Sequence, residues 1–123
     1  MDKGSRRGDA PFDIQERTFQ FGVRIVCIAD KLPRSIAAAE ITRQLIRAGT
    51  SVGANMEEAS EGLSRRDFLN HVRIARKEAK ESRYWLAVIH AADLCRDPEV
   101  TALREEAGAI VRILTSIIKK SSP

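Results

Sequence analysis

The amino-acid sequence predicts an all-α protein, an antiparallel up-down-up-down four-helix bundle. Apolar residues recur at alternating spacings of three and four in four separate segments, which is the spacing of one helix face. The connections between these segments are short, and short connections force consecutive helices to run antiparallel. The composition agrees, because only 5% of the 123 residues are aromatic and 31% are charged.

The first helix is expected from Asp13 to Lys31, with Asp13 as its N-cap and Glu16 completing a capping box. Pro33 should end it. Residues 1–11 are polar and lack periodicity, so they are predicted to be a disordered leader, and the bundle domain is predicted to span residues 12–120. The apolar face of this helix comprises Phe21, Ile25, Ile28 and Leu32.

The second helix is expected from Ser35 to Glu61, capped by Ser35 and closed by Gly62. Gly49 and Gly53 lie in its interior, and small residues there indicate the close approach of another helix. Its apolar face comprises Ile41, Leu45, Ala48, Val52, Asn55 and Ala59. An amide on such a face must be hydrogen-bonded, so Asn55 is interpreted as a residue that fixes the packing register, with a ligand contact as the alternative.

The third helix is expected from Arg65 to Cys95, with Ser64 as its cap and Asp67 at the third position. Its apolar face has the longest unbroken pattern in the chain: Phe68, Val72, Ala75, Ala79, Ser82, Leu86 and Ile89. A second apolar strip beside it favours a further neighbour, either within the bundle or in another subunit: Ile74, Trp85, Val88 and Ala92.

The fourth helix is expected from Pro98 to Lys119, with Asp97 as its cap and Glu99 favouring the positive helix end. Its apolar face comprises Val100, Leu103, Ala107, Ile110, Leu114 and Ile117.

Positive charge is concentrated on the third helix. Residues 63–96 hold eight Lys or Arg and four Asp or Glu, so this segment carries the net charge of +4 that the whole chain has. Seven of the cations fall within an arc of roughly 120°, facing away from the apolar stripe: Arg65, Arg66, Arg73, Arg76, Lys77, Lys80 and Arg83. Three interpretations remain open, namely a solvated face, a surface that follows phosphates, and a subunit interface with a neighbour's acidic flank.

No catalytic constellation is evident in the sequence, so no enzyme, metal or cofactor is predicted. A di-iron site needs Glu-x-x-His pairs, but Phe68 and Ala87 precede His71 and His90 by three residues. There is no nucleophile elbow and no glycine-rich phosphate loop between a strand and a helix. The carboxylates Glu57, Glu58 and Glu61 are interpreted as a solvated helix end rather than a general acid or base.

The chain is expected in the cytoplasm. Its N-terminus lacks the apolar region of a signal peptide, and no apolar run approaches the roughly 18 residues of a membrane span. Cys27 and Cys95 lie within apolar helical patterns and are predicted to be buried, reduced thiols.

Residues 48–86 resemble the bacterial family of 23S rRNA intervening-sequence proteins. The most specific part is a Ser-Val-x-Ala-Asn-x-x-Glu motif that includes Ser51, Asn55 and Glu58, which are interpreted as structural residues. A Ser-x-x-Asp-Phe turn and a Glu-x-x-Tyr-Trp-Leu stretch (residues 81–86) follow. The family's usual Asn-Ile-Ala-Glu-Gly run departs here, because Ala59 replaces the glycine. The likeness extends over residues 12–118.

The resemblance implies an antiparallel bundle that assembles into a homo-oligomeric ring, a pentamer. A related protein, the accessory variability determinant of diversity-generating retroelements, binds a reverse transcriptase and nucleic acid through a basic surface. The family name records a gene location within rRNA genes, and the resemblance implies no enzyme. The favoured interpretation is therefore a non-enzymatic oligomer that binds RNA, or a protein that handles nucleic acid, through the seven cations. The alternative is a protein-only scaffold whose charged faces form the subunit interface.

Overall fold

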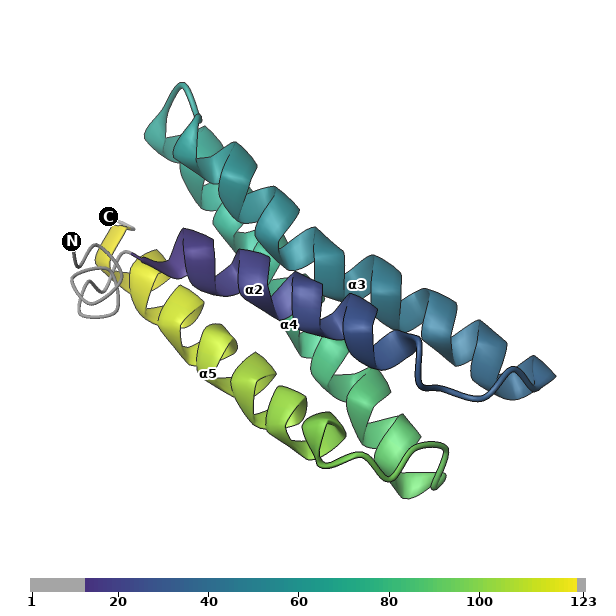
Figure 1. Ribbon diagram of the computed structural model, residues 1–123. Helices are drawn as coiled ribbons and strands as arrows, with labels where there is room; N and C mark the ends of the chain where they lie inside the picture. Colours follow the sequence, from purple (N-terminus) through teal and green to yellow (C-terminus); the bar gives the residue numbers. More distant parts are fainter. Residues whose placement is uncertain (1–12, 122–123) are drawn as a thin grey trace, which may run out of the picture.

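Four α-helices form the structure, a computed structural model that describes residues 13–121 (Figure 1). They are α2 (Ile14–Ala29), α3 (Ile36–Ser60), α4 (Arg65–Ala91) and α5 (Pro98–Ser121). No strand occurs within residues 13–121, so the prediction of an all-α four-helix bundle is confirmed. The predicted leader, residues 1–11, lies outside the described residues.

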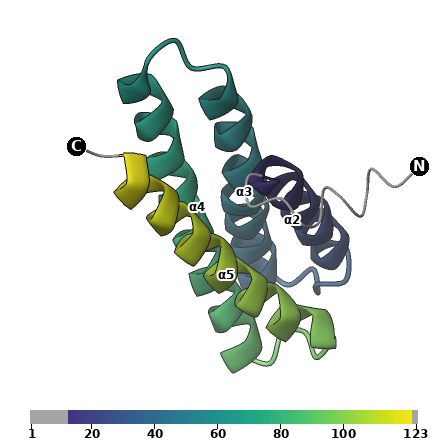
Figure 2. The same ribbon diagram turned by 90° about the vertical axis from the view of Figure 1, so that its left-hand side faces the viewer.

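Each helix packs against two neighbours, in the cyclic order α2, α3, α4, α5 (Figure 2). The chain reverses direction at each of its three connections (Figure 1). The α2 and α5 helices run antiparallel, because Arg17 bonds to Glu106 near one end while Lys31 bonds to Asp97 at the other. The hairpin of α3 and α4, with 25 and 27 residues, extends past the other two helices, as the lengths predicted from the sequence indicate.

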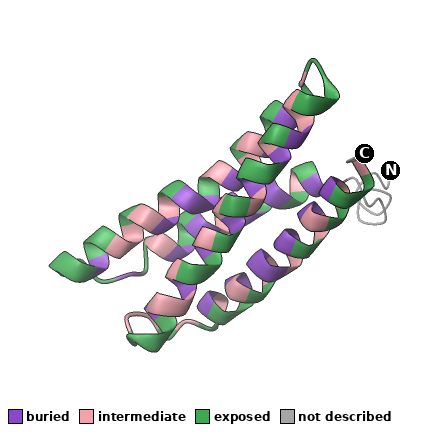
Figure 3. Ribbon diagram, turned by 180° about the vertical axis from the view of Figure 1, so that it is seen from behind, coloured by how far each residue is buried: buried purple, intermediate pink, exposed green. Residues whose placement is uncertain are grey.

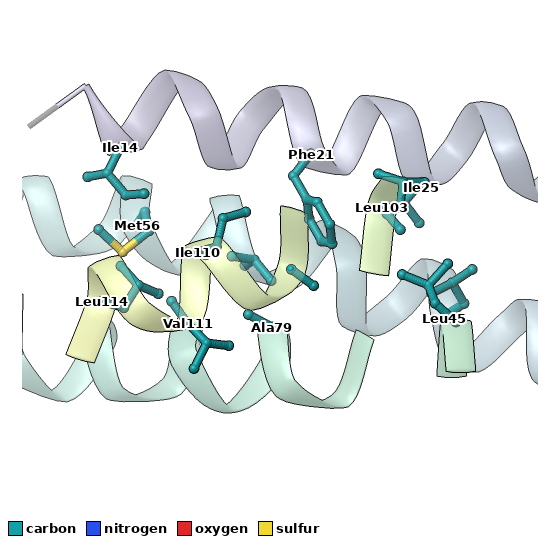
Figure 4. Packing of buried hydrophobic residues seen from close by; sticks show 14 of the residues in the cluster. Ile14, Phe21, Ile25, Leu45, Met56, Ala79, Leu103, Ile110, Val111 and Leu114 are labelled. Carbon is teal, nitrogen blue, oxygen red and sulfur yellow. The ribbon is translucent and has the colours of Figure 1, made fainter. Parts of the chain in front are cut away.

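The core is formed by the apolar faces of all four helices (Figure 4). Phe21, Leu45, Leu86 and Leu103, one from each helix, are at most 1% exposed. Within residues 13–121, the buried polar residues are Thr18 and Ser82, and each hydroxyl donates to a carbonyl four residues earlier in its own helix. These two buried hydroxyls are thus hydrogen-bonded, as burial requires.

The predicted face of α3 needs one correction. Asn55 is only half-buried, and Met56 takes the core position beside it at 5% exposure. The Asn55 amide donates to the Ser51 carbonyl, one turn earlier in the same helix, at 2.9 Å. Since this bond joins two residues of α3, it does not provide the register between helices that the sequence suggested.

Three of the four predicted N-caps are confirmed. Ser35 and Ser64 accept hydrogen bonds from the backbone N–H three residues later, at 3.3 and 3.1 Å. Asp97 accepts one from the N–H of Glu99 at 2.9 Å. The Asp13 prediction is wrong, because its side chain makes no cap hydrogen bond. Its backbone, with ψ of 25°, lacks the extended conformation that turns an N-cap side chain over the first turn.

Helix α4 ends at Ala91, four residues before the predicted end at Cys95. Asp93 adopts a positive φ of 57°, and the Leu94 N–H reaches back to the Ile89 carbonyl at 3.0 Å. This is the Schellman arrangement, which closes a helix with one left-handed residue. The sequence did not reveal this helix end, because aspartate takes that conformation less often than glycine does.

Helices α2 and α3 approach closely at their glycines, as predicted from the small residues of α3. A Cβ on Gly49 would lie 2.7 Å from Ile25 Cγ1, and a Cβ on Gly53 would lie 3.1 Å from the Thr18 carbonyl oxygen. A Cβ on Gly22, by contrast, would meet its nearest atom at 3.6 Å, an ordinary contact. The close approach therefore depends on Gly49 and Gly53 rather than on every glycine in the contact.

Gly49→Ala is expected to destabilise the bundle. Overpacking against Ile25 costs about 1–3 kcal/mol, and the better helix propensity of alanine offsets about 1 kcal/mol of that. The matched control, Gly22→Ala, has room for its methyl group and should stabilise the protein by about 0.5–1 kcal/mol. Urea unfolding of both variants measures the contrast. Equal stabilisation by the two substitutions would contradict the close packing.

Candidate nucleic-acid interface

The seven predicted cations lie along α4, which begins at the Ser64 cap and presents its apolar face to the core. Six of them are exposed and Arg76 is half-buried. The structure divides them into two groups. Arg65, Arg76 and Arg83 border α5, whereas the other four point further outward: Arg66, Arg73, Lys77 and Lys80.

Two of the three border residues of α4 donate to the backbone or a hydroxyl of α5 rather than to a carboxylate. Arg65 Nη1 donates to the Ser121 carbonyl, and Arg76 Nη1 donates to Thr115 Oγ1, both at 3.2 Å. These bonds fix the guanidiniums near the seam between α4 and α5 while leaving their charge uncompensated.

Helix α5, which packs against α4, carries four further cations that the sequence interpretation did not include: Arg104, Arg112, Lys119 and Lys120. The first three share one side of α5 by helical spacing, so a signal was present in the sequence. That this side faces the basic edge of α4 depends on the rotation of α5 about its axis, which core packing sets. We call the seven α4 cations and these four α5 cations the basic surface.

No residue of the basic surface forms an ion pair with any residue in the described range 13–121. Two of the three carboxylates of α5, Glu99 and Glu106, pair with α2 instead, whereas Glu105 is exposed and forms none of these ion pairs. Three pairs bridge these helices: Arg17–Glu106 at 2.6 Å, Arg24–Glu99 at 2.7 Å and Lys31–Asp97 at 2.8 Å. Two carboxylates of α5 therefore face α2, whereas Arg112 of α5 lies near Arg83 of α4.

Pairing shifts the titration of these bridging groups. The hydrogen bond from Arg24 lowers the pKa of Glu99, and the bond from Lys31 lowers the pKa of Asp97. The same bonds raise the pKa of Arg24 and of Lys31. The charged forms of all four groups are thus favoured in the folded protein.

Acid should weaken the bundle partly through Glu99. Its pKa is lower in the folded protein than the unfolded value of about 4.3, so its contribution to stability is present above that pH and is lost as the pH falls through the folded pKa. The difference in urea midpoint between wild type and Glu99→Gln should therefore narrow as the pH falls below about 4.

The matched control for this measurement is Glu40→Gln. Glu40 approaches Arg43 of its own helix at 3.8 Å, and both side chains are exposed, so its removal should change the midpoint little at any pH. A difference between wild type and Glu99→Gln that stays constant with pH would contradict the proposed pairing effect.

The motif residues Ser51, Asn55 and Glu58 follow one another along one side of α3. Ser51 Oγ donates to the Arg47 carbonyl at 2.7 Å, and Asn55 donates to Ser51 as described above. Glu58 is exposed, as are Glu57 and Glu61. The motif lies on α3, whereas the basic surface lies on α4 and α5, and both of the motif's hydrogen bonds lie within α3.

The outer side of α2 and α3 carries an apolar groove of about 430 Å³. Phe19, Val23 and Val26 line it and are 57%, 40% and 49% exposed. Cys27 also lines it and is exposed, so the prediction that both thiols are buried is wrong for this residue. Cys27 lies beside the core stripe of α2 rather than on it, whereas Cys95 is half-buried against the core. Both thiols are free.

The second apolar strip on α4 lies on the surface in part. Ile74 is 36% exposed, and Trp85 is half-buried against the core while its Nε1 donates to Glu81. Tyr84 adds to the strip, because it is 60% exposed and its ring meets the Trp85 ring edge-on. The exposed green positions in Figure 3 show how much of each helix faces outward.

The histidines lie far apart on α4. His71 Nδ1 is 3.0 Å from the Asp67 carbonyl, and His90 is exposed near the other end of the helix. Within residues 13–121, no three His, Cys, Asp or Glu side chains gather in a way that could hold a metal ion. None of the described helices is long and apolar enough to cross a membrane.

The fold and this surface define a small helical bundle with uncompensated positive charge on two adjacent helices. Residues 11–116 match the model of the 23S rRNA-intervening sequence protein family, and the chain belongs to that family. A solved structure from Bacteroides thetaiotaomicron VPI-5482, a protein with unknown function from the S23 ribosomal protein family, is similar. It is 31% identical, has a TM-score of 0.77, and the match covers 89% of this chain and 97% of that one. A search among curated proteins finds no match.

Proposed function

We propose that this protein is a non-enzymatic, cytoplasmic homo-oligomer that binds RNA through its basic surface. The proposal rests on one observation. The eleven cations of the basic surface, on α4 and α5, form no ion pair with any described residue. Such a surface attracts a polyanion, because each phosphate contact releases counterions from the nucleic acid.

The proposal assigns no catalysis to the bundle. His71 and His90 are nineteen positions apart on one helix, which separates them by about 28 Å. No nucleophile with an adjacent base is found among the described residues. The chemistry available on the basic surface is charge and hydrogen-bond donation, which suits binding.

Assembly is proposed because two apolar surfaces of the described chain face outward on different sides. The groove on α2 and α3 has Glu57 in its lining, whereas the strip on α4 has Lys77 between Ile74 and Tyr84 in the sequence. A second copy that seats its α4 strip in the groove would match both apolar surface and charge. Contacts between two different surfaces form a ring when the rotation closes, and we propose a pentamer from the family resemblance.

The test is the mass in solution, by light scattering at low salt, with and without mixed cellular RNA. The proposal expects a closed oligomer of the 13.7-kDa chain that gains mass with RNA and loses that gain at high salt. An oligomer indifferent to RNA would favour the alternative, a protein-only scaffold, for which the exposed apolar groove is the supporting observation. A monomer would overturn the assembly.

A further inference from the structure

Two guanidinium groups from different helices converge over Gly108, a buried position on α5. A Cβ built on Gly108 would lie 3.6 Å from Arg112 Nη1 and 3.7 Å from Arg83 Nη1. The two nitrogens are therefore no more than about 7 Å apart. Because residue 108 has no side chain, nothing from that position fills the space between them.

No carboxylate stands between these charges. Neither Arg83 nor Arg112 forms an ion pair with any residue from 13 to 121. Glu105 precedes Gly108 by three positions and is exposed, but it pairs with neither of them. Two like charges this close repel each other unless an anion joins them.

A third arginine, on the same helix as Gly108, has a buried N–H group without a hydrogen-bond partner. Arg104 lies one turn before Gly108 on α5, and its Nε is buried without a hydrogen-bond partner. A buried donor without a partner is uncommon in folded proteins and often marks the place of a bound water, ion or ligand. Arg76, the next border cation on α4, continues the row through its bond to Thr115.

We propose that Arg83 and Arg112 hold one backbone phosphate of RNA over Gly108, flanked by Arg104 and Arg76. Two charge-assisted hydrogen bonds of about 2.8 Å, to different oxygens of one phosphate, span a gap of this size. The inference rests on the proposed RNA-binding function and names its anchoring site. RNA fits better than a lone anion, because exposed cations continue outward from the seam: Arg66, Arg73, Lys77 and Lys80.

The test compares two double variants that remove the same charge. The seam double variant combines Arg83→Gln with Arg112→Gln. Fluorescence anisotropy of labelled single-stranded RNA should show that it binds about 10-fold or more weakly than the wild type. The control, Arg66→Gln with Arg73→Gln, removes two exposed cations that form no hydrogen bond or ion pair with the described residues of α5 and should cost only a few-fold. Equal losses in the two variants would overturn the anchoring site while leaving RNA binding intact.

Substitutions at Gly108 give a second, independent measurement. Gly108→Glu places a carboxylate beside both guanidiniums, so it should raise the melting temperature and weaken RNA binding by about as much as the seam double variant. Gly108→Ala puts an uncharged methyl group 3.6 and 3.7 Å from the two nitrogens, so it should weaken RNA binding clearly less than Gly108→Glu does. If Gly108→Glu binds RNA as tightly as Gly108→Ala does, RNA is not anchored between Arg83 and Arg112.

Inorganic pyrophosphate separates this inference from the proposed function. Its addition should raise the melting temperature of the wild type and not that of the seam double variant. If the wild type binds no RNA but shows this shift, the seam is a site for a small phosphate anion, and both the RNA ligand and the proposed function fail. If RNA binds and pyrophosphate has no effect on either protein, the phosphate anchor fails.

Discussion

Reversing three charges on α4, with Arg73→Glu, Arg76→Glu and Lys80→Glu together, is expected to weaken RNA binding by on the order of 100-fold or more at low salt. Each cation that contacts a phosphate contributes counterion release, and its replacement by an acid adds repulsion. Loss of three contacts should also reduce the slope of log affinity against log salt by about 2 for single-stranded RNA. Anisotropy titrations at several salt concentrations measure both quantities.

The matched control reverses three exposed cations in the connection before α3 and in the first half of that helix: Arg34→Glu, Arg43→Glu and Arg47→Glu. It changes the net charge equally but leaves the basic surface intact, so most of the affinity and of the salt slope should remain. Equal weakening by both triple variants would mean that net charge alone attracts RNA. Unchanged RNA binding with a lower oligomer mass in the α4 variant would assign those residues to the subunit interface.

The sequence was sufficient for most of the fold because the core repeats with the period of a helix. Val72, Ala75, Ala79 and Leu86 follow the alternating spacing on α4, and all are buried. Burial of one face is the strongest constraint on the sequence of a helix, and it leaves apolar residues at regular spacings of three and four. The ends of helices are set by single residues, and Asp93 shows how an uncommon backbone conformation escapes such a pattern.

The surface was harder to predict, since apolar character alone does not determine exposure. Val23, Val26 and Cys27 fit a helical sequence as well as Ile25 does, yet only Ile25 faces the core. Polarity also gives no indication of which helix lies beside a cation. The seam around Gly108 brings together residues twenty-five positions apart in the chain, Arg83 and Gly108, and only the packing of α5 on α4 reveals it.

Val23→Glu should convert the proposed oligomer to monomers. Val23 lies in the apolar groove with Phe19 and Val26, and in the assembly this groove would be covered by a second copy. A carboxylate buried there without a partner costs several kcal/mol, so the dissociation constant should rise by about 100-fold or more. Light scattering at micromolar protein concentration would then report the 13.7-kDa chain.

The folded state should survive this change, because Val23 is already 40% exposed in the single chain and its side chain is not part of the core. Far-ultraviolet circular dichroism and the urea midpoint should therefore stay near those of the wild type. Ala102→Glu, which adds the same charge at an exposed position of α5 outside the groove, should leave the oligomer mass unchanged. An oligomer that keeps its full mass with Val23→Glu must be joined through another face, and the groove would then be left for a different protein partner.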